Sequence, residues 1–257
     1  MTHDFSGKRA LVTGAASGIG AAAARAMAKA GAEHLVLVDL DKERLAALDL
    51  PCAVSLHAGD VADEALWDAI EAEANDAGTT LDAAFLNAGI PGQPAPFAKM
   101  SFAEWRKVIS VNLDGLFLSL RSSMRLASDG AAIVLTASVA GVKAEPGIGP
   151  YGASKAGVIH MAKIAAKEGA PRRIRVNAIA PGGVDTGIWD GVPFFDNLVA
   201  KHQGDRAGAL SAMAEGMTPM GRFESAEEIA GQVLFLLSGA SGTMTGTTLV
   251  SDGGYSL

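Results

Sequence analysis

The sequence predicts an α/β fold, in which a doubly wound parallel sheet of about seven strands carries helices on both faces. Short apolar, β-branched runs alternate with longer segments of helical spacing along the 257 residues. Most of the short runs are continuously hydrophobic, as expected for strands buried on both faces of a parallel sheet. Strand–helix alternation of this kind is typical of βαβ units. No linker, low-complexity tract or repeat divides the chain, so we expect one domain over residues 1–257.

The elements follow one another in a regular order. The expected strands are residues 10–13, 34–39, 53–57, 83–87, 131–137, 175–180 and 247–250. The expected helices, which combine helix-forming residues with a 3.6-residue apolar period, are residues 18–30, 42–48, 63–77, 102–126, 151–168 and 226–237. The segment at about 187–220 is less regular. An insertion of this length is often a substrate lid, and the alternative is a peripheral helix pair that covers the core.

Composition and charge exclude several function classes. The net charge of −7 argues against nucleic-acid or anionic-membrane partners, which require clustered Lys and Arg. The lone Cys52 cannot form an internal disulfide. The first residues lack the apolar run of a signal peptide, and no stretch approaches the roughly 20 apolar residues of a membrane span. We therefore expect a cytoplasmic protein without a membrane partner.

A glycine-rich loop joins the first expected strand to the first helix. Glycines at positions 14, 18 and 20 lie in the run Thr13-Gly14-Ala15-Ala16-Ser17-Gly18-Ile19-Gly20. At a strand–turn–helix junction, such glycines permit a tight turn, close approach to a pyrophosphate and tight helix packing. The helix N-terminus then offers free N–H groups to the phosphates. The loop predicts a Rossmann-type dinucleotide site.

Asp39 ends the second strand, 19 residues after Gly20. A carboxylate in this place accepts hydrogen bonds from the adenosine ribose hydroxyls and repels a 2′-phosphate. Ser17 and Leu40, where a reader of NADP would favour a basic residue, are uncharged. The sequence thus predicts NAD in preference to NADP. The alternative reading of Asp39 is a helix N-cap.

Tyr151 and Lys155 are spaced for acid–base chemistry. Residues i and i+4 of a helix lie on one face, and a neighbouring ammonium favours the phenolate. We expect Lys155, together with the positive charge of an oxidised nicotinamide, to lower the pKa of Tyr151 toward neutrality. Ser138 lies 13 residues earlier, at the carboxyl end of a strand, where doubly wound sheets bind ligands. The alternative is an amphipathic helix with a core Tyr and a surface Lys.

The chain resembles the short-chain dehydrogenase/reductase (SDR) family in motifs that follow one another over residues 10–253. The glycine loop has the T-G-x-x-x-G-x-G form of that family. The other matching motifs are Gly59-Asp60-Val61, Asn87-Ala88-Gly89, Asn112, Ser138, the Y-x-x-x-K pair Tyr151 and Lys155, and the Pro181-Gly182 loop that ends in Thr186. The extra glycine Gly183 and the residue Asp185 depart from the pattern of the family.

The resemblance implies hydride transfer between a nicotinamide cofactor and a secondary alcohol or ketone. It makes Asn112, Ser138, Tyr151 and Lys155 catalytic, with Ser138 on the substrate oxygen, Tyr151 as general acid/base, and Asn112 holding a water of a proton relay. It places Asp60 near the adenine and Thr186 at the nicotinamide carboxamide. The expected cofactor-binding residues are Gly14, Ser17, Gly18, Ile19, Gly20, Asp39, Leu40, Asp60, Val61, Asn87, Ala88, Gly89, Tyr151, Lys155, Pro181, Gly182, Val184 and Thr186. No cluster of His, Cys and carboxylates predicts a metal.

The segment 187–220 also bears on the substrate. Its residues Trp189, Phe194, Phe195 and three methionines predict an apolar or aromatic substrate portion. An NAD-binding redox sensor without turnover remains an alternative, as does a scaffold with a vestigial site. A sensor needs no acid/base group, so the complete Ser138, Tyr151 and Lys155 set favours an enzyme. The expected helices 102–126 and 151–168 are apolar on more than one face, and the family is commonly tetrameric, so we expect a homotetramer.

Overall fold

The computed structural model, which describes residues 3–257, contains the expected sheet. Seven parallel strands lie in the order β3-β2-β1-β4-β5-β6-β9. Their bounds are β1 Arg9–Thr13, β2 His34–Asp39, β3 Ala53–Ala58, β4 Leu81–Leu86, β5 Ala127–Thr136, β6 Arg175–Pro181 and β9 Thr248–Ser251. The prediction of continuous hydrophobic strands is confirmed for the five inner strands, which are almost completely buried. It is wrong for β3 and β9, which form the edges of the sheet: β3 is largely exposed, and β9 is half-buried.

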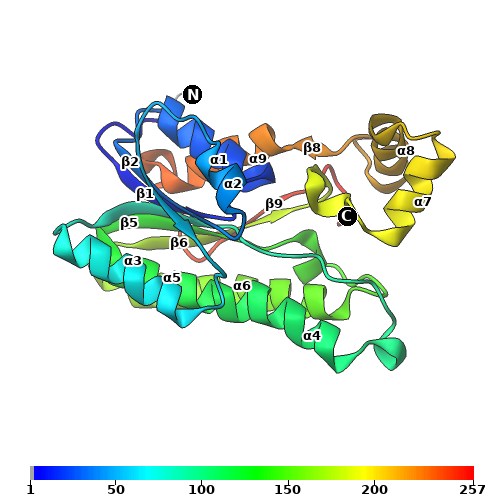
Figure 1. The fold of residues 1–257 in the computed structure, drawn as a ribbon, viewed down its shortest axis with the longest axis horizontal. Helices are drawn as coiled ribbons and strands as arrows, with labels where there is room; N and C mark the ends of the chain where they lie inside the picture. The colour runs from blue at the N-terminus through cyan, green and yellow to red at the C-terminus, as the bar shows by residue number, and fades with distance from the viewer. Residues whose placement is uncertain (1–2) are drawn as a thin grey trace.

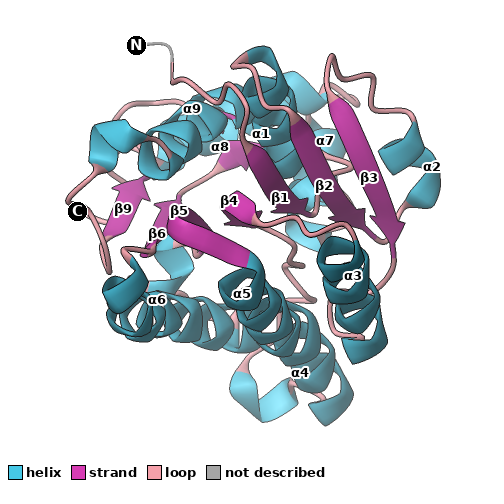
Figure 2. Cartoon of the chain, turned by 90° about the vertical axis from the view of Figure 1, so that its left-hand side faces the viewer, coloured by secondary structure: helices cyan, strands magenta, loops and turns pink. Residues whose placement is uncertain are grey.

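Two helical layers enclose the sheet (Figures 1 and 2). Helices α1, α2 and α9 share one apolar core with one face, and α3, α5 and α6 share a second core with the other face. The bounds are α1 Gly18–Lys29, α2 Lys42–Ala46, α3 Glu64–Asp76, α4 Phe102–Ile109, α5 Gly115–Leu126, α6 Gly149–Gly169 and α9 Ala226–Leu237. Within residues 3–257, no helix is long and apolar enough to cross a membrane.

The helix expected over residues 102–126 is interrupted. A π-helical turn, η2 (Ser110–Asp114), separates α4 from α5. Asn112 lies in this turn and is 1% exposed. Its amide makes hydrogen bonds to Ile90 and Ser154, and π-helical turns of this kind frequently lie at functional sites.

The irregular segment forms a helix pair at one end of the molecule (Figure 1). Helices α7 (Pro193–Lys201) and α8 (Arg206–Met217) enclose a small core of their own, made of Val192, Phe195, Ala209, Leu210 and Met213. The two stems of the segment pair as short parallel strands, β7 (Val184–Asp185) and β8 (Glu224–Ser225). The segment therefore contains two helices, and these pack on each other around a core separate from those of the sheet.

A histidine at the amino end of β2 makes stability depend on pH. Burial lowers the pKa of His34, and the charge of Arg9 lowers it further. Arg9 donates to Nδ1 at 3.3 Å, so the neutral ring presents its Nε2–H to Ser55 Oγ at 3.0 Å. At a pH just below the ordinary His pKa of about 6.5, His34 therefore binds a proton in the unfolded chain but remains neutral in the folded protein.

We accordingly expect the free energy of unfolding to decrease as the pH falls below about 6.5, and His34→Gln to flatten part of this decrease. Urea unfolding at a series of pH values measures it. His57, whose pKa burial also lowers, contributes a further part. His160→Gln, at an exposed position of α6, is the control. An unchanged pH profile in His34→Gln would contradict the assignment.

Candidate active site

The site lies at the carboxyl edge of the sheet, where the strand order reverses between β1 and β4. This switch point is where open α/β sheets bind ligands. Thr13, the last residue of β1, accepts hydrogen bonds at Oγ1 from the backbone N–H groups of Asn87 (2.9 Å) and Ala88 (3.1 Å). Thr136, at the end of β5, donates to Asn87 Oδ1 at 3.2 Å. Asn87 therefore ties three neighbouring strand ends together.

The glycine loop forms a cradle at the start of α1. Gly14 and Gly18 have φ values of 64° and 51°, in the left-handed region that favours glycine. A Cβ on Gly20 would overlap the Gly14 carbonyl oxygen. A Cβ on Gly18 would lie 3.3 Å from Thr186 Cγ2 and would fill the space between the loop and Thr186. The absence of side chains keeps this space and the first N–H groups of α1 open, so the loop fits a dinucleotide pyrophosphate.

Asp39 stands next to the cradle. Its Oδ2 accepts a hydrogen bond from the Ala16 backbone N–H at 2.9 Å, and its Oδ1 accepts one from Asp41 N at 3.0 Å. The N-cap of α2 is Asp41, which accepts from Arg44 N, so the N-cap reading of Asp39 is wrong. Each carboxylate oxygen keeps a further lone pair for a ribose hydroxyl.

Three further predicted cofactor residues lie beyond Asp39. Leu40 is 76% exposed, whereas Val61 is 6% exposed and packs against Gly115 at the start of α5. Asp60 is exposed, and its Oδ1 accepts from Ala62 N at 2.9 Å, which fixes the turn after β3. The strand ends thus place Asp39, Leu40 and Asp60 along one edge, as an adenosine site requires.

Ser138, Tyr151 and Lys155 come together beside the end of β5. Lys155 is 4% exposed, and its Nζ donates to the Thr136 carbonyl oxygen at 2.7 Å and lies 5.7 Å from the centre of the Tyr151 ring. Ser138 is 7% exposed and caps η3 (Val139–Gly141) by accepting from Ala140 N at 3.2 Å. The reading of Lys155 as a surface lysine is therefore wrong, because its ammonium is buried at the strand end.

Burial shifts the pKa values of both Tyr151 and Lys155. Burial raises the pKa of Tyr151, and the hydrogen bond with Ser138 opposes the rise. Burial also lowers the pKa of Lys155 to about 8, and its ammonium points to the Thr136 carbonyl. Desolvation therefore opposes charge on both groups, and the expected lowering of the Tyr151 pKa, which includes the positive charge of an oxidised nicotinamide, stays a prediction. A net lowering of the Tyr151 pKa therefore requires the positive charge of an oxidised nicotinamide.

Asn112 connects the η2 turn to the strand edge. Its Oδ1 accepts from Ile90 N at 2.8 Å, and its Nδ2 donates to the Ile90 carbonyl at 2.9 Å and to Ser154 Oγ at 3.2 Å. A Cβ on Gly89 would lie 3.2 Å from Asn112 Oδ1 and 3.4 Å from Lys155 Nζ. Asn112 is therefore a structural bridge, and Gly89 leaves space between Asn112 and Lys155.

The predicted nicotinamide-side segment runs from Pro181, at the end of β6, to Thr186. Pro181 and Val184 are buried, and a Cβ on Gly182 would lie 2.7 Å from the Asp252 Cα, so the C-terminal segment forces glycine there. The Thr186 hydroxyl caps η5 (Gly187–Trp189) by accepting from Ile188 N at 3.4 Å. These contacts hold Thr186 against the glycine loop.

The substrate-side residues separate into two groups. Phe195 and Met213 are 1% and 9% exposed and form the core of the helix pair, so the expectation that they face a substrate is wrong. The exposed apolar residues of this region are Ile188, Phe194, Met217 and Met220. The sequence could not separate the groups, because an aromatic residue in an irregular segment carries no sign of its burial partner.

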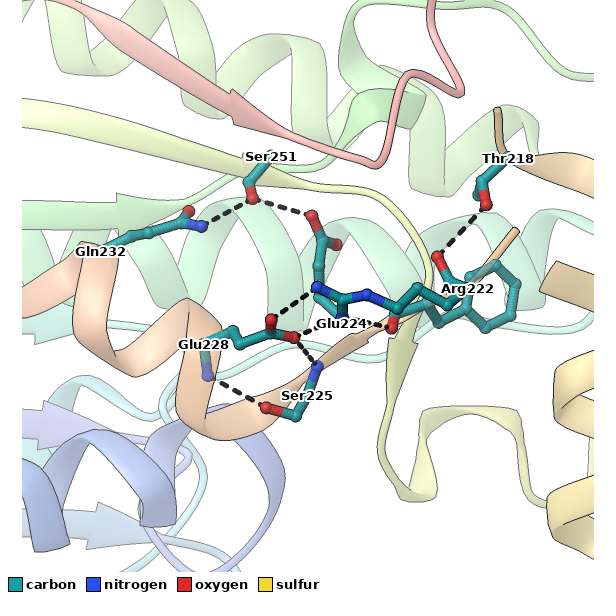
Figure 3. Close-up of polar contacts among 8 residues, drawn as sticks. Thr218, Arg222, Glu224, Ser225, Glu228, Gln232 and Ser251 are labelled. Carbon is teal, nitrogen blue, oxygen red and sulfur yellow. Dashed lines mark hydrogen bonds and ion pairs between the residues drawn. The ribbon is translucent and has the colours of Figure 1, made fainter. Parts of the chain in front are cut away.

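Sequence reasoning also missed the anchor of the return stem (Figure 3). Arg222 forms a two-donor ion pair with Glu228 at 2.7 and 2.8 Å, and Glu228 and Ser225 form a capping box at the start of α9. Ser251 of β9 donates to Glu224 at 2.8 Å and accepts from Gln232 at 2.8 Å. The spacing of Ser225 and Glu228 signals the capping box. Thr136 was missed as well, although a threonine that ends a strand beside Ser138 was a usable signal.

Known proteins resemble this chain over almost its whole length. A family model described as enoyl-(acyl carrier protein) reductase matches residues 14–256. Cis-4-hydroxycyclohexanecarboxylate dehydrogenase of Sinomonas cyclohexanicum is 36% identical, over 99% of this chain and 99% of its own. The chain belongs to the short-chain dehydrogenase/reductase family.

Other SDR proteins extend the comparison. Cyclohexanol dehydrogenase of Acinetobacter sp. (strain SE19) is 34% identical, over 99% of this chain and 96% of its own. The carveol dehydrogenase of Mycobacterium avium, solved with NAD, superposes with a TM-score of 0.91 at 29% identity over 99% of both chains. The L-sorbose reductase of Gluconobacter frateurii, solved with NADPH and L-sorbose, gives 0.91 at 30% identity over 99% and 98%. These SDR relatives are oxidoreductases of alcohols and sugars, and they differ in their cofactor.

Proposed function

We propose that this SDR chain is an NAD-dependent oxidoreductase that interconverts a secondary alcohol and its ketone. The observation that carries the proposal is the meeting of Ser138, Tyr151 and Lys155 at the strand edge that also holds the glycine cradle. A redox sensor without turnover would need the glycine cradle but not these three residues. We further propose one catalytic domain over residues 1–257, with residues 187–220 as its substrate lid.

Each residue has a separate task in this chemistry. The nicotinamide, when bound, accepts or gives the hydride. Ser138 donates a hydrogen bond to the substrate oxygen and orients it. Tyr151 takes the hydroxyl proton during oxidation and returns one to the carbonyl oxygen during reduction. Lys155 would hold the ribose hydroxyls of the nicotinamide, and Asn112 would hold a water through which the proton leaves.

The preference for NAD rests on Asp39. Its carboxylate stands beside the glycine loop, where it would accept from ribose hydroxyls and repel a 2′-phosphate. The neighbouring Leu40 is exposed and uncharged, so it provides no hydrogen-bond donor or positive charge for the 2′-phosphate of NADP. Among the SDR relatives, one is solved with NAD and another with NADPH. The cofactor preference must therefore be measured on this chain.

The substrate proposed is an alcohol with an apolar or aromatic portion, such as a substituted cyclohexanol. Ile188, Phe194, Met217 and Met220 supply exposed apolar surface at the lid. Two of the relatives carry cyclohexane alcohols in their names. An apolar lid favours such a ring over a polyol, because a polyol brings hydroxyl groups that require hydrogen-bonding partners.

A panel of secondary alcohols tests the function. We expect growth of the reduced-nicotinamide absorbance with NAD and cyclohexanols, with a higher kcat/KM than for acyclic polyols. Tight NAD binding without turnover on any alcohol would support the sensor, and the absence of NAD binding would support the scaffold. Turnover confined to polyols would contradict the apolar substrate.

A homotetramer is proposed as well. Phe117 of α5 and Ile164 of α6 are 50% and 47% exposed on the layer of helices that covers one face of the sheet. Exposed apolar groups of this size on neighbouring helices favour contact with another subunit. Light scattering on the purified protein measures the mass, and a monomeric mass would contradict the proposal.

A further inference from the structure

The first residue of α8, Arg206, connects the helix pair to the segment that carries Thr186. Its NH1 donates to Asp185 Oδ1 at 2.8 Å, its Nε to Asp190 Oδ1 at 3.1 Å, and its NH2 to the Thr186 carbonyl oxygen at 2.7 Å. The guanidinium also lies 5.6 Å from the centre of the Phe195 ring. One lid side chain therefore binds the Thr186 carbonyl and the carboxylates of Asp185 and Asp190, which precede and follow Thr186 in the chain.

The guanidinium suits this task better than an ammonium. The two carboxylates raise the pKa of Arg206, so it stays charged throughout the working pH range. A planar fork donates in three fixed directions at once, whereas a lysine acts as a point charge on a flexible stem. The three acceptors lie within six positions of one another, so binding them fixes the shape of that turn.

A second contact joins the same two parts of the chain. A Cβ on Gly183 would overlap the ring of Phe223. Phe223 stacks on Trp189, with ring centres 5.7 Å apart and planes at 6°, and Trp189 Nε1 donates to the Val184 carbonyl at 2.8 Å. Gly183 and Asp185, the two departures from the family pattern, thus both meet residues of the lid or its stem.

The position of Thr186 gives these contacts a functional consequence. Its methyl group lies against the glycine loop, 3.3 Å from the place of a Gly18 Cβ. A shift of the Thr186 backbone would therefore change the space between Thr186 and the glycine loop, in which the cofactor is proposed to lie. Because Arg206 belongs to the lid and binds the Thr186 carbonyl, the lid determines the position of the Thr186 backbone.

We propose that Arg206 is a positioning residue of the reaction: with Asp185 and Asp190 it forms an ionic latch that sets Thr186 for the nicotinamide carboxamide when the lid is closed. This inference rests on the proposed function, since it requires Thr186 to contact the cofactor. The hydrogen bonds of Arg206 go to Asp185, Asp190 and the Thr186 carbonyl, so Arg206 acts through the Thr186 backbone.

Kinetics of Arg206→Ala, Arg206→Lys and Asp185→Asn test the latch. We expect Arg206→Ala to lower kcat/KM about tenfold, the size of one lost charged hydrogen bond, with a raised KM for NAD. Arg206→Lys should recover part of the loss. Asp185→Asn keeps an acceptor oxygen and should have a smaller effect, which disappears in the Arg206→Ala background because the partner is already missing.

A matched control separates positioning from stability. Arg172 also uses three donors, to Asp129 Oδ1 and to the carbonyls of Met124 and Ala127, but at the amino end of β5, opposite the site. Arg172→Ala should lower the unfolding temperature as much as Arg206→Ala does and leave KM for NAD unchanged. If Arg206→Ala lowers only the unfolding temperature, with kcat/KM within twofold of the wild type, the latch is overturned.

Limited proteolysis distinguishes failure of the latch from failure of the proposed function. NAD should slow cleavage within residues 187–220 of the wild type, and this protection should decrease in Arg206→Ala. Cleavage is measured without turnover, so it is informative even if no alcohol is oxidised. Wild-type protein that neither binds NAD nor turns over an alcohol would overturn the proposed function, whereas equal protection of both proteins by NAD would overturn the latch alone.

Discussion

Replacing Tyr151 with Phe should lower kcat by about 10²- to 10⁴-fold, the usual contribution of a positioned acid/base group. The phenol is the group that stands beside both Ser138 and the buried Lys155 ammonium at the strand edge. Phe retains the ring and its packing but cannot take or give a proton. Steady-state kinetics with a cyclohexanol measures the loss, and titration of NADH fluorescence should give a dissociation constant within about twofold of the wild type.

The chain contains a natural control for this substitution, since it has two tyrosines. Tyr255 donates its hydroxyl to Glu145 Oε1 at 2.7 Å in the C-terminal segment. Tyr255→Phe removes the same oxygen atom from a hydrogen bond and should leave kcat within a few-fold of the wild type. Full activity of Tyr151→Phe would remove Tyr151 from its proposed role.

The pH dependence of kcat follows from the same site. Burial raises the pKa of Tyr151, so oxidation, which needs a proton acceptor, should become faster as the pH rises through the pKa of the bound state. Reduction needs the protonated phenol and should change in the opposite direction. This reciprocal profile belongs to the Tyr151 prediction and should disappear in Tyr151→Phe.

Replacing Asp39 with Ala should change the ratio of kcat/KM for NAD to that for NADP by about 10- to 100-fold in favour of NADP. One charged hydrogen bond to a hydroxyl contributes roughly 1.5–3 kcal/mol, and each 1.4 kcal/mol is a factor of ten. NAD loses this contact, while the 2′-phosphate of NADP no longer meets a negative charge. Ala16 N loses an acceptor as well, so some loss with both cofactors is expected.

Asp41→Ala is the matched control for cofactor choice. It removes a carboxylate two residues away, which caps α2 through Arg44 N at 3.0 Å. It should reduce stability by about 1 kcal/mol, the usual contribution of an N-cap, and leave the ratio unchanged. An unchanged ratio in Asp39→Ala, or an equal change in Asp41→Ala, would refute the ribose assignment.

Much of the fold could be predicted because its signals are local. The bounds of β2 and α9 agree with the expected residues 34–39 and 226–237. In β2 a continuous apolar run ends at a charged residue, and α9 combines helix-forming residues with an apolar period. The predicted bounds of β5 were less accurate, since the strand begins at Ala127 and its first residues include Ser, Asp and Gly, which carry no strand pattern.

The candidate site could be predicted for a related reason. Its glycines and the Tyr151–Lys155 pair have spacings that fix their geometry within one turn or one helix. The burial that raises the pKa of Tyr151 could not be predicted, because it depends on the tertiary packing around the ring. The partners of Asn112, which lie 22 and 42 positions away, were equally outside the reach of any spacing rule.

The sequence by itself determined the α/β class, the glycine cradle, the helical Tyr–Lys pair and the carboxylate that ends β2. Only the tertiary structure decided which strands form the edges, where the helix at Asn112 is interrupted, and which lid aromatics are buried. It alone brought Arg206 to Asp185, 21 positions earlier in the chain. The spacing of residues along one helix or strand determines on which face their side chains lie, because the backbone repeats regularly. Contacts between elements depend on the packing of the whole chain, which no local pattern encodes.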